Sequence, residues 1–172
     1  MSSIVYFAYG SNMSTPRIKR RIESATVVST ARLYEHALRF HKKSIDGSAK
    51  CDIQHTRHPQ DIVFGVIFEI HRREKHVLDR YEGLGSGYEE KQVTTFLPDG
   101  RVTTATTYYA THIDASLKPY HWYKEHVLRG AREHALPAEH IAAIEAIESI
   151  ADPSDTNHAS ELSIYPESNG LL

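Results

Sequence analysis

The chain has 172 residues, with 20 Lys and Arg against 22 Asp and Glu and a formal net charge of -2. This balance provides no positive field for nucleic acid or an acidic membrane, so we expect neither as a partner. A single cysteine, Cys51, excludes an internal disulfide. No apolar stretch is long enough to cross a bilayer, and the N-terminal apolar run lacks the basic flank of a signal peptide. We therefore expect a soluble, cytoplasmic protein.

The start of the chain combines a short apolar run with a turn. Residues 4–9 predict a strand, which stops at the Gly-Ser-Asn sequence of residues 10–12. Ser14 or Thr15 can cap a short helix that contains a proline in its first turn. Free amides at residues 10–12, near the positive end of that helix, make a candidate anion site. From spacing alone an ordinary strand–turn–helix corner is the better supported interpretation, because Gly-Ser-Asn is common in turns.

The first two-thirds of the chain read mainly as strands. Alternating or continuous apolar residues predict strands at 25–33, 37–40 and 62–70, and a hairpin of 92–97 with 102–109. The run at 62–70 is nearly all apolar and is expected to be the central strand. Gly65 within it indicates a bulge or a close backbone approach.

The spacing of apolar residues predicts helices at 16–21, 72–81 and 120–133. A further helix is predicted from Pro137 onward, where isoleucines recur up to residue 150. About six strands followed by two helices indicate an α+β fold, with a small barrel as one form of it, rather than a doubly wound sheet. We expect one domain at 1–150. Residues 151–172 are rich in Ser, Asn, Asp and Pro and predict a poorly ordered, polar C-terminal tail.

Glu82 is a candidate acid/base residue. It follows the predicted helix at 72–81 and precedes glycines at 83, 85 and 87, which permit positive φ and leave room for a ligand. A carboxylate at the lip of an apolar barrel would have its pKa raised by desolvation and serve as a base and then as an acid. A solvated glutamate at a helix end is the alternative interpretation.

Other candidate chemistries are weaker. Cys51 has histidines nearby but lacks four suitably spaced ligands, so we predict no metal site and interpret it as a strand cysteine. The basic run at 17–21 is interpreted as a solvated helix face that complements the dipole. The tyrosines at 108–109 and 120–123 are interpreted as packing residues with polar ends.

An ordered set of segments resembles the γ-glutamylcyclotransferase family over about residues 4 to 150. The segments are Tyr9-Gly10-Ser11-Asn12 after an apolar strand, residues 31–33 with Leu38 and Phe40, residues 63–68, Glu82-Gly83 with Tyr88 six residues later, and residues 130–133 with Leu136-Pro137. The resemblance implies a small mixed β-barrel flanked by helices. It also implies a small-molecule γ-glutamyl substrate, an intramolecular cyclisation to 5-oxoproline within glutathione metabolism, and no metal or cofactor.

The same resemblance implies particular site residues. Glu82 would be the catalytic acid/base, and the substrate-binding residues would be Tyr9, Gly10, Ser11, Asn12, Tyr88 and Tyr108. Backbone amides of residues 10–12 would hold the α-carboxylate of the substrate. A homodimer is compatible with this assignment.

The leaving group stays open at this point. The segment between Glu82 and Tyr88 is one residue shorter than in the family pattern. A γ-glutamylamine or an antibiotic precursor is therefore an alternative substrate. A non-catalytic protein that binds a γ-glutamyl metabolite is the alternative of another class, although a pure binder of an anion gains nothing from Glu82.

Overall fold

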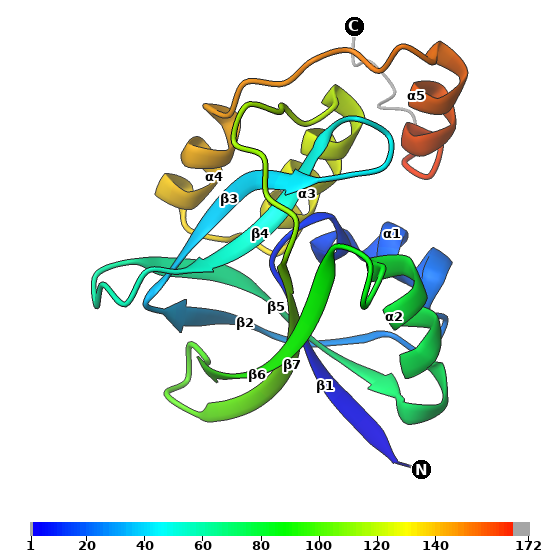
Figure 1. Ribbon diagram of the computed structural model, residues 1–172. Helices are drawn as coiled ribbons and strands as arrows, with labels where there is room; N and C mark the ends of the chain where they lie inside the picture. The colour runs from blue at the N-terminus through cyan, green and yellow to red at the C-terminus, as the bar shows by residue number, and fades with distance from the viewer. Residues whose placement is uncertain (1, 167–172) are drawn as a thin grey trace, which may run out of the picture.

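A closed five-stranded barrel with helices around it forms the centre of the molecule, in a computed structural model that describes residues 2–166 (Figure 1). The elements in chain order are β1 (Ser3–Ala8), η1 (Ser11–Met13), α1 (Thr15–Arg21), β2 (Thr26–Tyr34), β3 (His36–Lys43), β4 (Ala49–His55), β5 (Ile62–His71), η2 (Arg72–Glu74), α2 (Lys75–Glu82), β6 (Tyr88–Phe96), β7 (Val102–Ala110), α3 (His121–Glu133), α4 (Ala138–Glu145) and α5 (Asp155–Leu162). The α+β class and the flanking helices are confirmed.

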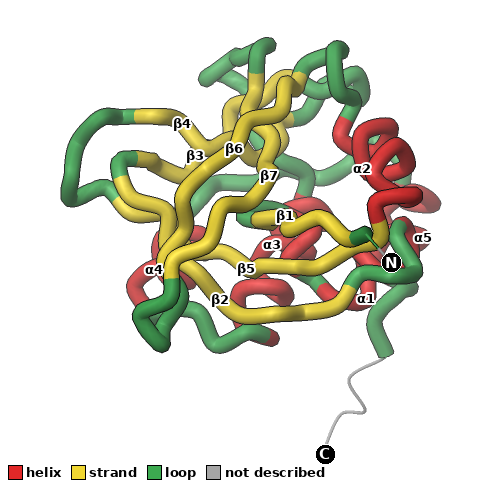
Figure 2. Tube along the Cα trace, turned by 90° about the horizontal axis from the view of Figure 1, so that it is seen from below, coloured by secondary structure: helices red, strands yellow, loops and turns green. Residues whose placement is uncertain are grey.

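The barrel strands follow the order β1-β5-β2-β6-β7, and Figure 2 shows them curling around one another. Neighbours are antiparallel except β1 and β7, whose parallel pairing at Tyr6 and Thr106 closes the barrel. The barrel is therefore mixed, as expected. Closure matters for the site because it brings the C-terminal end of β1 next to β7.

The strand β5 is central, since it pairs with β1 along six residues and with β2 along eight. Its Gly65 lies where the backbone of β1 comes closest: a Cβ atom there would stand 2.4 Å from the Ala8 carbonyl oxygen and 2.6 Å from a ring carbon of Phe7. The expected close approach is confirmed. The absence of a side chain at Gly65 lets β1 and the loop after it pack onto the barrel.

The strands β3 and β4 form a separate two-stranded sheet that lies at one end of the barrel (Figure 1). Asp52 of β4 is buried, and its carboxylate accepts a 2.7 Å hydrogen bond from the Ala110 amide at the end of β7. This bond fixes the hairpin on one end of the barrel. As a result, Cys51 faces the loop that follows β1.

Two helices end or begin at the positions that the local chemistry predicted. The hydroxyl of Ser14 caps α1 by accepting from the Arg17 amide, so Ser14 rather than Thr15 is the N-cap. The helix α2 ends at Glu82, and Gly83 adopts the left-handed conformation with φ 72°. Glycines 85 and 87 also have positive φ, as expected.

The expectation of a poorly ordered polar tail is wrong for residues 155–162, which form α5. Ser154 caps this helix by accepting from the Asn157 amide. Glu161 binds Arg17 of α1, and the Tyr165 hydroxyl donates to Ser14. The expected tail also includes residues 167–172, which lie outside the described residues. None of the helices within residues 2–166 is long and apolar enough to span a membrane.

We predict that Gly65→Ala destabilises the protein by about 2–3 kcal/mol or more, because the added methyl group overlaps a backbone oxygen that cannot move away. Denaturant unfolding measures this. Gly47→Ala is the control, since its Cβ would meet no atom within 4 Å and would cost only the strain of φ 84°, about 1 kcal/mol. Equal losses in the two variants would contradict the packing argument.

Candidate active site

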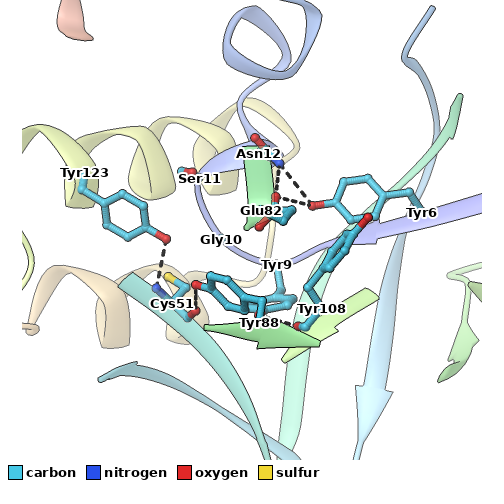
Figure 3. A pocket seen from close by; sticks show the side chains of 10 residues that line it. All are labelled: Tyr6, Tyr9, Gly10, Ser11, Asn12, Cys51, Glu82, Tyr88, Tyr108 and Tyr123. Atoms are coloured by element: carbon cyan, nitrogen blue, oxygen red, sulfur yellow. Dashed lines mark hydrogen bonds between the residues drawn. The ribbon is translucent and has the colours of Figure 1, made fainter. Parts of the chain in front are cut away.

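A small cavity opens at the end of the barrel where β1 runs into η1 (Figure 3). The seven residues assigned from the sequence all lie around it, and their catalytic and binding assignments remain predictions. The lining residues are Tyr6, Tyr9, Gly10, Ser11, Asn12, Cys51, Glu82, Tyr88, Tyr108 and Tyr123. Elements from the first, middle and last thirds of the chain therefore meet at one place.

The carboxylate of Glu82 is bound by side chains from β1 and η1. The side-chain amide of Asn12 donates to Glu82 Oε1 at 2.6 Å, and the Tyr6 hydroxyl lies 3.5 Å from the same oxygen. Asn12 also donates to Tyr6 at 3.3 Å, so the three groups form a triangle (Figure 3). Glu82 is thus held inside the cavity and is not a solvated helix end.

Burial raises the pKa of the Glu82 carboxyl above its ordinary value, and the positive charges of Arg21 and Arg17 oppose that change. A carboxyl group with a raised pKa exchanges protons more readily near neutral pH than an ordinary glutamate does. The environment of Glu82 is therefore that of an acid/base group.

The loop after β1 offers unpaired donors. The backbone amides of Ser11 and Asn12 donate no hydrogen bond to any residue within 2–166. Gly10 packs closely against the opposite wall, since a Cβ atom there would lie 3.0 Å from Cys51 Cβ and 3.4 Å from the Tyr123 hydroxyl. The loop can therefore bind an anion through its amides, and Gly10 keeps that space open.

The tyrosines of the cavity are tied to the backbone or to a neighbouring carboxylate. Tyr9 donates to the Tyr108 carbonyl at 2.7 Å, and Tyr88 donates to the Cys51 carbonyl at 2.5 Å. Tyr108 donates to Asp79 at 2.6 Å, while Tyr123 accepts from the Cys51 amide at 2.9 Å. With their hydroxyls fixed, the rings form rigid walls.

Burial raises the pKa of the Cys51 thiol to about 12, so the group is uncharged at neutral pH. This environment does not suit a nucleophile. The expected strand cysteine is confirmed as a buried residue of β4, and its place in the cavity wall was not anticipated.

The interpretation of residues 17–21 as a solvated face is wrong for Arg17, which is buried. Its Nε donates to the Ser11 hydroxyl at 3.1 Å, and its Nη1 donates to Glu161 Oε2 at 2.7 Å. His126 Nε2 lies 3.0 Å from both Arg17 Nη1 and Glu161 Oε2. Arg17 therefore connects the loop after β1 to α3 and α5.

Arg21 supports the same loop from another side. Its Nη1 donates to Asn12 Oδ1 at 3.1 Å, and its guanidinium group stacks on the Tyr81 ring at 4.8 Å. Because Arg21 occupies the oxygen of the Asn12 amide, the nitrogen of that amide faces Glu82. This arrangement fixes which end of Asn12 meets the carboxylate.

Sequence reasoning missed five residues of this region: Tyr6, Cys51, Tyr123, Arg17 and Arg21. Tyr6 sits in a strand whose residues all read as core. Tyr123 shares the apolar face of α3, and the arginines belong to a basic run. The local pattern offers one signal for Tyr6, because strand alternation places it on the same side as Gly10.

Comparison with known proteins agrees with the fold. Residues 62–144 match the AIG2-like family. Over 156 residues the chain is 34% identical to the γ-glutamylcyclotransferase of Bos taurus and 33% identical to that of Homo sapiens. Each of the two alignments covers 85% of this chain and 79% of the relative.

The similarity extends to three-dimensional structure. A solved structure of a γ-glutamyl cyclotransferase has a TM-score of 0.84 and 29% identity, over 92% of this chain and 97% of that chain. The chain therefore belongs to the γ-glutamylcyclotransferase family, and the resemblance drawn from its motifs is confirmed.

We predict that acid destabilises the protein through the cluster around Arg17. Burial lowers the pKa of His126 from 6.5 to about 4, and the contacts with His126 and Arg17 lower the pKa of Glu161 to about 2. Between pH 6.5 and 4 the unfolded chain gains a proton at His126 that the folded chain does not. The free energy of unfolding then falls by about 2–3 kcal/mol from this group alone.

Glu161 adds a further loss as the pH falls from 4.5 toward 2, because its ionised form is stabilised only in the folded protein. Denaturant unfolding across pH 2–7 measures both effects. His126→Gln should flatten the decline, and His121→Gln, at the exposed start of α3, should leave it unchanged. A decline of the same slope in His126→Gln would refute the assignment.

Proposed function

We propose that this protein is a γ-glutamylcyclotransferase, which converts a γ-glutamyl amino acid or amide to 5-oxoproline and releases the free amine. The observation that carries the proposal is the Glu82 carboxylate, held 2.6 Å from Asn12 in a cavity lined on another side by free backbone amides. Relatives of that name at 33–34% identity over most of the chain support it.

Binding begins with the loop after β1. The amides of Ser11 and Asn12 donate to the α-carboxylate of the γ-glutamyl group, near the N-terminus of α1, whose dipole favours negative charge. The rigid tyrosine walls then confine the aliphatic part of the glutamyl chain. This confinement turns the α-amino group toward its own γ-carbonyl carbon.

Glu82 moves the protons of the reaction. Its carboxylate takes a proton from the α-ammonium group, and the freed amine attacks the γ-carbonyl carbon to form the new C–N bond of the ring. As the original amide bond breaks, Glu82 returns a proton to the departing nitrogen. The products are 5-oxoproline and an amine, and no further reactant is needed.

The reaction requires no nucleophile from the protein because the nucleophile belongs to the substrate. Holding the amine against the carbonyl carbon lowers the barrier through orientation. Well-oriented intramolecular reactions reach effective molarities on the order of 10⁵ M or more. The uncharged thiol of Cys51 fits this view, since Cys51 lines the cavity without taking part in the reaction. A lone, buried cysteine also suits the cytoplasm, where we expect this reaction as part of glutathione metabolism.

Glu82→Gln should abolish turnover while the fold is kept, because glutamine preserves the contact with Asn12 but accepts no proton. We expect the rate with γ-glutamyl-alanine to fall at least about 10²–10⁴-fold, measured as 5-oxoproline by mass spectrometry. Glu89→Gln, at an exposed position of β6, is the matched control and should retain full activity. A Glu82→Gln variant with wild-type turnover would rule out Glu82 as the acid/base.

Gly10→Val should weaken substrate binding, because its branched side chain enters the space in front of Cys51 and crowds the amide loop. We expect KM for γ-glutamyl-alanine to rise on the order of tenfold or more, since small displacements of a positioning group have large effects. Steady-state kinetics measures the change, with thermal unfolding as a check on the fold. An unchanged KM in a folded variant would show that the loop does not bind the substrate.

A further inference from the structure

Lys42 is a buried cation beside the cavity. It belongs to the end of β3 and is only 8% exposed. Its ammonium nitrogen lies 4.8 Å from the centre of the Tyr88 ring. Gly87 makes room for it, since a Cβ atom on that glycine would stand 3.0 Å from Lys42 Nζ. The ammonium group is therefore packed against the residue that forms one wall of the cavity.

The other cations around the cavity have partners. Arg17 pairs with Glu161 at 2.7 Å, and Lys50 pairs with Asp46 at 2.8 Å. Arg21 donates to Asn12. Within residues 2–166, by contrast, the side chain of Lys42 makes neither a hydrogen bond nor an ion pair, and its partner is the face of the Tyr88 ring.

The side chain of Lys42 is mostly buried, but its ammonium nitrogen keeps some contact with solvent, so an anion can approach it. Burial lowers the pKa of Lys42, while the charges of Glu82 and Asp46 act in the opposite direction without cancelling it. The influence of Glu82 also means that the ammonium group lies within electrostatic reach of the catalytic carboxylate. Lys42 is therefore a cation that lacks a counter-ion next to the reacting centre.

The chemistry of the reaction supplies an anion at this place. Glu82 must reach the departing nitrogen in order to protonate it. In a γ-glutamyl amino acid, the carboxylate of the leaving residue is only two bonds from that nitrogen. The carboxylate of the leaving residue and the ionised Glu82 carboxylate repel one another at this distance. A cation nearby offsets that repulsion. The amides of Ser11 and Asn12 are already occupied by the first carboxylate of the substrate.

We propose that Lys42 binds the carboxylate of the leaving amino acid and makes the enzyme distinguish γ-glutamyl amino acids from uncharged γ-glutamyl amides. This inference rests on the proposed function and adds to it the group that selects the leaving group. The first carboxylate of the substrate binds the loop after β1, and the second binds Lys42, so that the scissile bond lies between them beside Glu82.

The experiment compares two substrates that differ only in this charge: γ-glutamyl-alanine and γ-glutamyl-alaninamide. For each, kcat/KM is measured from 5-oxoproline formation with the wild-type protein and with Lys42→Met, Lys42→Arg and Lys43→Met. Lys43 is the matched control because it is the exposed neighbour in the same strand. Thermal unfolding checks that each variant is folded.

We expect Lys42→Met to lower kcat/KM for γ-glutamyl-alanine about tenfold or more, the size of a lost charged hydrogen bond, and to change the value for the alaninamide less than about twofold. The ratio between the substrates then changes about tenfold. Lys42→Arg, which keeps the charge, should restore most of the preference. Lys43→Met should leave the ratio at its wild-type value.

Two outcomes overturn the proposal in different ways. If the wild-type protein turns over either substrate but Lys42→Met leaves the ratio unchanged, Lys42 does not bind the carboxylate and the proposed function stands. If the wild-type protein forms no 5-oxoproline from either substrate, the proposed function falls and the assignment of Lys42 falls with it.

Discussion

The hydrogen bond between Asn12 and Glu82 is the interaction on which the site depends. A carboxylate enclosed at the end of an apolar barrel is unfavourable unless a donor meets it, and the Asn12 amide does so at 2.6 Å. The bond joins the loop after β1 to the last residue of α2, two segments that are 70 positions apart. Both must be in place together. The packing of Gly65 against the Ala8 carbonyl fixes one of them, and the left-handed Gly83 that ends α2 fixes the other.

A second set of contacts, around Arg17, joins the loop after β1 to the helix α5. Arg17 reaches from α1 to the Ser11 hydroxyl on one side and to Glu161 on the other. The helix α5 therefore helps to hold the site together, because its carboxylate neutralises a buried arginine that binds the loop after β1. Tyr165 adds a hydrogen bond to Ser14, the cap of α1. The C-terminal segment is in this sense part of the support of the site.

The Asn12–Glu82 bond and the contacts around Arg17 both join distant parts of the chain, and this explains what the sequence could and could not predict. The strands and the turn after Glu82 follow from local rules, because each depends on residues within a few positions. A glycine inside the apolar strand at Gly65 indicates a close approach, but the residue that comes close, Ala8, lies in another strand. The docking of α5 does not follow from local rules, since it depends on the contact of Glu161 with Arg17, 144 positions away. The same holds for Arg17 itself: a basic run at a helix end reads as solvated until a distant carboxylate covers it. Tyr123 reads as core from its helix alone, and only the β3–β4 hairpin brings Cys51 to it.

The balance of charges around Glu82 suits the proposed mechanism, in which this residue both takes and gives a proton. Burial alone favours the protonated carboxyl, which cannot act as a base. The positive charges of Arg21, Arg17 and Lys42 lower the pKa again and keep the ionised form accessible. An anionic substrate that binds beside these cations offsets their field, and the proton affinity of Glu82 then rises as the proton arrives from the α-ammonium group. Under the proposed mechanism, these cations keep Glu82 ionised before the substrate binds, and their field is offset once it has bound, so that Glu82 can hold the proton for the departing amine.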